Sequence, residues 1–204
     1  MKYFFWFFIL LLFSSCSSKL RQSSYRLSSP EKIWIIIHPF KAKKAYFISL
    51  EAEKVKDSIK NYGSIGNDNK GGQLDAFKHS YWMARLSQSI GKRAAFGLGK
   101  AHEKGNYNTF KKHKLEDGFL PDKPSSDMDL FNNLVGIDIG NKSKNKSKME
   151  IIQQVLDSLQ KGRLRILSKD NLGNFLDCQG KIIRVDSLKG KWHTKKCLAP
   201  TNAK

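Results

Sequence analysis

Gly71-Gly72-Gln73-Leu74-Asp75-Ala76-Phe77-Lys78-His79-Ser80-Tyr81-Trp82 is the first of three dense polar clusters in this sequence. Asp75 and His79 are four residues apart, so a helix places both side chains on one face. Apolar residues fill the neighbouring positions, and an ionisable side chain is costly to bury among them unless it is paired. The pattern therefore predicts a helix over residues 72–90 that carries functional polar groups, with Gly91 as its end.

Two further clusters follow, Lys100-Ala101-His102-Glu103-Lys104 and Met128-Asp129-Leu130-Phe131-Asn132-Asn133-Leu134-Val135-Gly136. The first is expected to end a helix over residues 92–103, with His102 and Glu103 in its last turn. In the second, on a predicted helix over residues 128–139, the aspartate and the second asparagine are again four apart on one face. We expect the three clusters to converge on one pocket between packed helices.

This set of side chains points to hydrolysis. His79 is the candidate general base or ligand, Asp75 is expected to orient it, and Glu103 is the candidate acid partner. The predicted metal ligands are His79, His102 and Asp129, which would suit a divalent ion such as Zn²⁺, Mn²⁺ or Ca²⁺. The predicted substrate-binding residues are Trp82, Asn132 and Asn133. No HExxH or EF-hand motif is present, so the expectation of a bound ion depends on residue types alone.

The same clusters also fit a structural role. Buried polar networks fix the register of packed helices, and Asp75 and Asp129 could cap the first turns of their helices. On that interpretation the protein is a non-catalytic binding or scaffolding lipoprotein of the cell envelope.

The N-terminus has the pattern of an export signal. Lys2 precedes an apolar run over residues 3–13, which is shorter than the roughly 20 residues of a membrane-spanning helix, and Ser14-Ser15-Cys16 follows. A cysteine after two small residues resembles a bacterial lipobox. It implies that residues 1–15 are a cleaved signal peptide and that Cys16 carries lipid, such as palmitate, at a membrane. A plain secretory signal is the alternative. Ser17 after Cys16 favours the periplasm-facing outer membrane over the inner membrane.

The cysteine count and the net charge agree with a location in the cell envelope. If Cys16 carries lipid, Cys178 and Cys197 remain as one pair, and their disulfide would stabilise the fold by about 3 kcal/mol. Lys and Arg total 37 against 18 acidic residues, a net charge of +19. Such a surface favours an anionic phospholipid or envelope polymer as partner. Nucleic acid is disfavoured as a partner by the predicted envelope location and by the lack of a basic strand face with aromatic residues. The oligomeric state stays open.

The predicted fold class is mainly α, a compact multi-helix domain with a small C-terminal β-hairpin or meander. The predicted divisions of the mature chain are a flexible tether (16–29), a helical core (30–162) and a disulfide-stapled β appendage (163–204).

Further expected elements complete the chain. A short buried helix ends at His38-Pro39, and helices follow over residues 41–61 and 149–160. Residues 104–126 are predicted as an irregular loop, followed by a helix that Ser126 or Asp127 caps. The appendage is expected to contain strands at residues 163–167 and 181–185.

The runs DAFKHSYW, AHE and MDLFNN–V–G resemble an uncharacterised bacterial domain family with the pattern DAFRHAYW, AHE and MDLxNNxxG. That family, a domain of unknown function, occurs in secreted, lipoprotein, phage and toxin-like proteins. The resemblance covers about residues 30–168 and implies a shared, mostly helical fold, but no established activity. Lys78, Ser80 and Met83 stand where the family has Arg, Ala and Asn. The residues that map onto the pattern are Asp75, His79, Trp82, His102, Glu103, Asp129, Asn132, Asn133 and Gly136.

Overall fold

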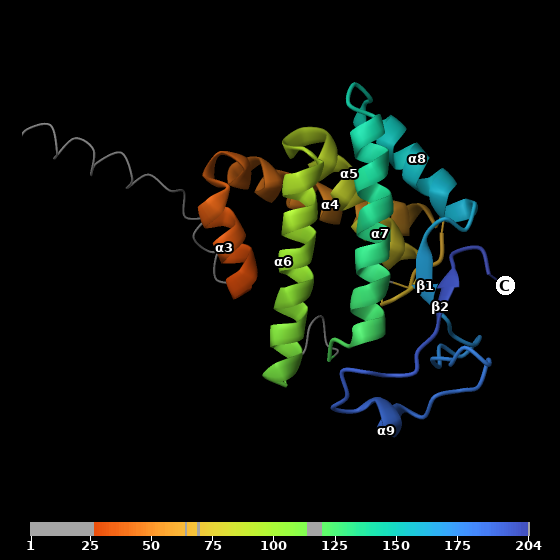
Figure 1. The fold of residues 1–204 in the computed structure, drawn as a ribbon. Coiled ribbons are helices and arrows are strands. Elements are labelled where there is room, and N and C mark those ends of the chain that lie inside the picture. Colours follow the sequence, from red (N-terminus) through yellow and green to blue (C-terminus); the bar gives the residue numbers. More distant parts are fainter. Residues whose placement is uncertain (1–26, 64, 69, 114–119, 204) are drawn as a thin grey trace, which may run out of the picture.

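The computed structural model describes residues 27–63, 65–68, 70–113 and 120–203. In this part of the chain the fold is mainly helical with one small two-stranded sheet, as the sequence predicts (Figure 1). The predicted signal peptide, Cys16 and the tether up to residue 26 lie outside the described residues. The elements are α3 (Ser29–Ile37), α4 (Pro39–Tyr62), α5 (Gln73–Ile90), α6 (Lys92–Lys111), α7 (Lys123–Lys142), α8 (Lys148–Gln160), β1 (Arg165–Leu167), α9 (Val185–Leu188) and β2 (Leu198–Pro200).

α5 is the central helix, and it packs against α4, α6, α7 and α8. Its contact with α7 is the closest, because a Cβ on Gly136 would lie 2.2 Å from the carbonyl oxygen of Ser80, and one on Gly140 would lie 2.0 Å from that of Ala84. These two contacts advance in the same direction along both helices. α5 and α7 are therefore parallel, and their N-terminal halves lie at the same end of the bundle.

Apolar side chains on the two sides of α5 form the core. Phe77, Tyr81 and Leu74 are fully buried in a cluster shared with α4 and α8, whereas Met83 and Leu86 pack toward α3, α4 and α6. Because the core surrounds α5, the polar residues of its first two turns are held among rigid neighbours.

Three helix boundaries or environments differ from the predictions. α6 continues to Lys111, so its predicted end at residue 103 is wrong, and only residues 112–122 separate it from α7. Gly105 and Asn106, which suggested a loop, are buried instead, and a Cβ on Gly105 would meet the Ser28 side chain at 2.5 Å. Tertiary packing overrides local propensity there. Asp122 caps α7 by accepting from the Ser125 amide, so the cap predicted at residue 126 or 127 is also wrong.

α3 has the predicted position but not the predicted burial. Trp34 alone on this helix is buried, and its indole Nε1 donates to the Ala94 carbonyl at 3.1 Å. Ile33, Ile36 and Ile37 are 60%, 74% and 65% exposed. Figure 1 shows α3 at the opposite end of the bundle from the sheet, and among the described elements it packs mainly against α6 and α4.

The C-terminal region confirms the disulfide between Cys178 and Cys197 and a small antiparallel sheet, but the strand predicted at residues 181–185 is wrong. β1 pairs antiparallel with β2, and residues 181–185 contribute an isolated bridge, Leu176 with Ile182, and the start of α9. Strand pairing is non-local, so composition alone assigned the wrong partner. β1 is fixed to the bundle because the Leu167 amide donates to the Gly71 carbonyl at 2.7 Å.

Within the described ranges, no helix combines the length and the apolar character that crossing a bilayer requires.

Candidate functional site

Asp75, His79 and Asp129 come together at the parallel ends of α5 and α7. Nε2 of His79 lies 3.5 Å from Oδ1 of Asp75 and 3.4 Å from Oδ1 of Asp129. One ligand atom from each residue lies within 4.8 Å of the other two. The spacing of four residues on α5 and the close α5–α7 contact together produce this group, which we call the Asp-His-Asp cluster.

The electrostatics of the cluster favour a neutral imidazole. Burial lowers the pKa of His79 well below its usual value, and the nearby positive charges of Lys78 and His102 act in the same direction, whereas Asn133 opposes them. A neutral imidazole presents a lone pair, as a metal ligand requires. Two carboxylates that face it at this distance favour a cation between them.

The cluster opens into a polar chamber of about 130 Å³ between α5, α6, the start of α7 and the C-terminal segment. Three lysines, Lys70, Lys78 and Lys196, line it together with the acidic residues. Lys196 is held in place, because its Nζ lies 2.8 Å from Oδ2 of Asp122. The chamber thus combines a cation-binding group with positive side chains that would attract an anionic substrate.

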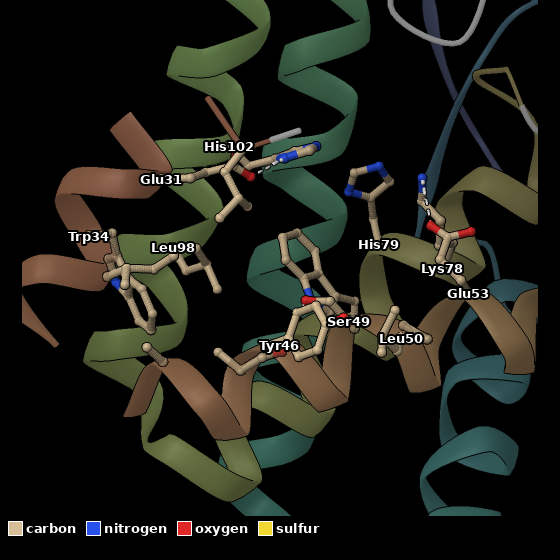
Figure 2. A pocket seen from close by; sticks show the side chains of 16 residues that line it. Glu31, Trp34, Tyr46, Ser49, Leu50, Glu53, Lys78, His79, Leu98 and His102 are labelled. Carbon is tan, nitrogen blue, oxygen red and sulfur yellow. Dashed lines mark hydrogen bonds and ion pairs between the residues drawn. The ribbon is translucent and has the colours of Figure 1, made fainter. Parts of the chain in front are cut away.

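An apolar cavity of about 270 Å³ meets the polar chamber at Lys78, His79 and His102, which line both spaces. Figure 2 shows this cavity, with His79 and His102 near one edge and the α4 residues Tyr46, Ser49 and Leu50 at another.

Glu31 orients His102 at this junction. Nδ1 of His102 lies 2.9 Å from Oε1 of Glu31, the interaction dashed in Figure 2. Burial acts to raise the pKa of Glu31, but the hydrogen bond and the charge of His102 outweigh it, so the pKa is lowered. A carboxylate that holds one imidazole nitrogen is the usual arrangement for a histidine that exchanges protons. The structure thus places His102 beside the Asp-His-Asp cluster, 6.1 Å between imidazole centroids, and not within its ligand set.

Glu103 lies in the α6–α7 interface behind the chamber. Its Oε2 accepts from Oγ of Ser126 at 2.8 Å and from Nδ2 of Asn106 at 3.3 Å, and its side chain is buried. Burial raises the pKa of Glu103 above its usual value. The structure therefore connects Glu103 to the chamber through Ser126 and Asn106, which line it.

The two neighbouring asparagines have different positions. Asn132 points away from the chamber: its Nδ2 donates to the Arg165 carbonyl and its Oδ1 accepts from the Arg165 amide, each at 2.9 Å. It joins α7 to β1. Asn133 is 2% exposed and lies near His79, and neither of its amide atoms makes a hydrogen bond of ordinary geometry with a described residue. A buried amide in that state is expected where a ligand supplies the missing partner.

Trp82 lines the apolar cavity rather than the chamber, and its Nε1 donates to Oγ of Ser49 at 2.9 Å. Its ring lies edge-on to both imidazoles, with centroids 6.4 Å from His79 and 5.5 Å from His102.

The geometry of the cluster fits a divalent cation. Donor atoms around a metal at about 2.1 Å are separated by about 3.0–3.4 Å in octahedral or tetrahedral sites, close to the distances at His79. Two carboxylates and one imidazole suit Zn²⁺ or Mn²⁺, and three protein ligands leave positions for water. Among the described residues, the group that could hold such an ion is thus Asp75, His79 and Asp129.

Sequence reasoning missed Glu31, Asp122, Ser126 and Lys196. Glu31 and Lys196 lie far along the chain from the motifs, on α3 and in the C-terminal segment. Lys196 is one of many lysines, and nothing in the local sequence distinguishes it. Ser126 was interpreted as a helix cap.

Fold and site together define a helical protein with an Asp-His-Asp cluster at the junction of a polar chamber and an apolar cavity. The chain belongs to the family described as Domain of unknown function (DUF6973), whose model matches residues 32–163. That range contains the whole cluster, as well as Glu103 and His102. Comparisons with curated proteins and with solved structures gave no match.

Proposed function

We propose that this protein is a lipid-anchored hydrolase of the cell envelope that uses a divalent cation to cleave a phosphodiester in an anionic substrate. The observation that carries the proposal is the Asp-His-Asp cluster, with 3.4 Å and 3.5 Å between His79 and the two carboxylates, at the wall of a lysine-lined chamber. The lipidated Cys16 and the envelope location follow from the N-terminal pattern.

Each residue has a role in this proposal. Asp75, His79 and Asp129 would hold the cation, and a cation held there would supply an activated water as the nucleophile. Lys78 and Lys196 attract the anionic group. In hydrolysis the water oxygen forms a bond to phosphorus and releases a proton, while the bond from phosphorus to the leaving oxygen breaks. His102, which Glu31 orients, is the proposed donor of the proton that the leaving alcohol takes up.

The test uses the full chain purified in mild detergent. Metal content is measured by mass spectrometry, and hydrolysis is followed with bis(p-nitrophenyl) phosphate. The variants are Asp129→Asn and His79→Ala, with Asp138→Asn and His193→Ala as matched controls, because Asp138 and His193 are exposed. We expect about one metal per chain in the wild type and the controls. Metal and hydrolysis should both be lost in the two cluster variants. Full hydrolysis by folded Asp129→Asn and His79→Ala proteins would overturn the proposal.

A second candidate is the non-catalytic envelope lipoprotein. The Asp75 side chain supports it, because its Oδ2 accepts from the Gly71 amide at 2.9 Å, as a structural cap would. On that interpretation Asp75→Asn lowers the melting temperature, and no variant changes hydrolysis or metal content.

A further inference from the structure

We propose that the apolar cavity binds an acyl chain of an anionic phospholipid taken from the membrane, which makes the substrate a lipid. The assignment of the lipid as substrate rests on the proposed function, whereas acyl binding does not.

The cavity has the size and lining of an acyl site. Its volume of about 270 Å³ is close to the lower end, about 300 Å³, of pockets that hold small molecules. Trp34 from α3, Ala42, Ala45 and Leu50 from α4, and Leu98 from α6 form apolar walls, as Figure 2 shows for the labelled members. The burial of methylene groups against such walls is the main source of affinity for a chain.

The junction between the apolar cavity and the polar chamber suits an amphiphilic ligand. His79, His102 and Lys78 border the apolar cavity on one side and the polar chamber on the other. A lipid whose chain lies in the cavity would therefore place its phosphate among Lys78, Lys196 and the Asp-His-Asp cluster. No purely polar substrate would use the apolar side of this junction.

The surface next to the cavity suits a membrane. Ile33, Ile36 and Ile37 occupy one face of α3 and are exposed, and Phe40, which follows the helix break, is 98% exposed. These apolar residues form what we call the α3 face, and exposed lysines flank it in the chain at positions 32, 41, 43 and 44. Apolar and basic side chains together bind the interface of an anionic bilayer. The occupant that fits both features is phospholipid.

The described part of the chain begins at the apolar cavity. Leu27, the first described residue, lines the cavity and lies eleven positions after Cys16. Eleven residues reach at most about 40 Å when extended, so a lipid on Cys16 would hold the cavity close to the membrane.

The test is photo-crosslinking in vesicles. The full chain is reconstituted into vesicles of equal parts phosphatidylcholine and phosphatidylglycerol, with a diazirine at the end of one acyl chain of the phosphatidylglycerol. Crosslinked residues are located by mass spectrometry in the presence of EDTA, so that the lipid stays intact. We expect crosslinks at Leu98, which is 7% exposed and is reached from the cavity.

Matched variants separate the cavity from the surface. Ala42→Phe fills the cavity and should reduce the crosslinks at Leu98 about tenfold, because the ring excludes roughly two methylene groups of the chain. Leu50→Glu at the cavity wall should act in the same direction if Ala42→Phe fails to fold. Ala203→Phe, at an exposed position, is the control.

Crosslinks confined to Ile36 and Phe40, or an unchanged yield at Leu98 in folded Ala42→Phe protein, would overturn the inference. The Asp129→Asn variant distinguishes the two proposals. If it retains hydrolysis and the crosslinks at Leu98, the proposed hydrolytic mechanism fails and the acyl site stands.

Discussion

Nε2 of His79 lies 3.4 Å from Oδ1 of Asp129, although the two residues are 50 positions apart in the chain. The parallel packing of α5 on α7 produces this contact, because Gly136 and Gly140 let the two backbones touch. The four-residue spacing on α5 places Oδ1 of Asp75 3.5 Å from the same Nε2. The site therefore depends on one helix–helix contact.

Divalent metal should stabilise the fold through the Asp-His-Asp cluster. A ligand at about 100 times its dissociation constant raises the free energy of unfolding by about 2.7 kcal/mol. We expect Zn²⁺ or Mn²⁺ to raise the melting temperature of the metal-free protein in a thermal-shift assay. Asp129→Asn should abolish the shift, and Asp138→Asn, on the exposed face of α7, should retain it. Equal shifts in both variants would place the metal elsewhere.

The close contact between α5 and α7 should be disrupted when a side chain replaces a glycine of α7. Gly136→Ala places a methyl group 2.2 Å from the Ser80 carbonyl oxygen, so α5 and α7 must separate. Overpacking of this kind costs about 1–3 kcal/mol, and we expect about 2 kcal/mol or more in urea denaturation. Leu134→Ala, at a position 52% exposed on the same helix, should change stability by less than about 0.5 kcal/mol. A stable Gly136→Ala protein would contradict the observed contact.

Substitution of Asn132 should lower the stability of the fold, whereas substitution of Asn133 should lower hydrolysis. Asn132→Ala removes both hydrogen bonds to the Arg165 backbone, and the unpaired buried groups should cost about 2–4 kcal/mol with metal binding retained. Asn133→Leu removes an amide that has no hydrogen bond of ordinary geometry with the described residues, so stability should hold within about 1 kcal/mol while hydrolysis falls. Urea denaturation and the phosphodiester assay distinguish the two. A larger stability loss at Asn133 would reverse these roles.

The disulfide should stabilise the C-terminal segment. Cys178 and Cys197 are separated by 19 positions, and a loop of that length corresponds to about 3 kcal/mol in the chain-entropy model. The double variant Cys178→Ser/Cys197→Ser should lose about that free energy of unfolding in urea. Reduced wild-type protein is the control and should lose the same amount. No loss in either sample would show that packing alone holds the segment.

Acid should weaken the contact between α4 and α5 through Glu51. Burial acts to raise its pKa, but hydrogen bonds from Arg85, Lys148 and Tyr81 outweigh it and lower the pKa to about 2. Because the folded pKa lies below the usual value of 4.5, the stabilisation is present above about pH 4.5 and is lost as the pH falls toward 2. We expect Glu51→Gln to show a smaller drop in urea midpoint between pH 6 and pH 3 than the wild type. An identical drop would assign the acid sensitivity to other groups.

Much of the helical architecture follows from local patterns. The four-residue spacing of Asp75 and His79 among apolar neighbours predicts α5, and Gly91 ends it as expected. The pairing of Cys178 with Cys197 was also predictable once Cys16 was assigned to lipid. These features depend on residues close in sequence or on simple counting.

Local patterns failed where burial decided the outcome. Gly105 and Asn106 indicate a loop in isolation, yet both are buried within α6, where Nδ2 of Asn106 donates to Glu103. The strand partner predicted for β1 was wrong because the antiparallel pairing joins residues that are distant in the chain.

By itself the sequence determined the mainly helical class, the four-residue pairs and the disulfide, since helix periodicity and cysteine number act locally. Only the tertiary structure decided which pairs meet. It turned Asn132 toward Arg165, left Asn133 beside His79, and placed Asp75 rather than His102 in the Asp-His-Asp cluster. It also brought Glu31 and Lys196 to the site from distant parts of the chain. The physical reason is that a contact between two helices depends on how closely their backbones approach, which here the glycines of α7 permit.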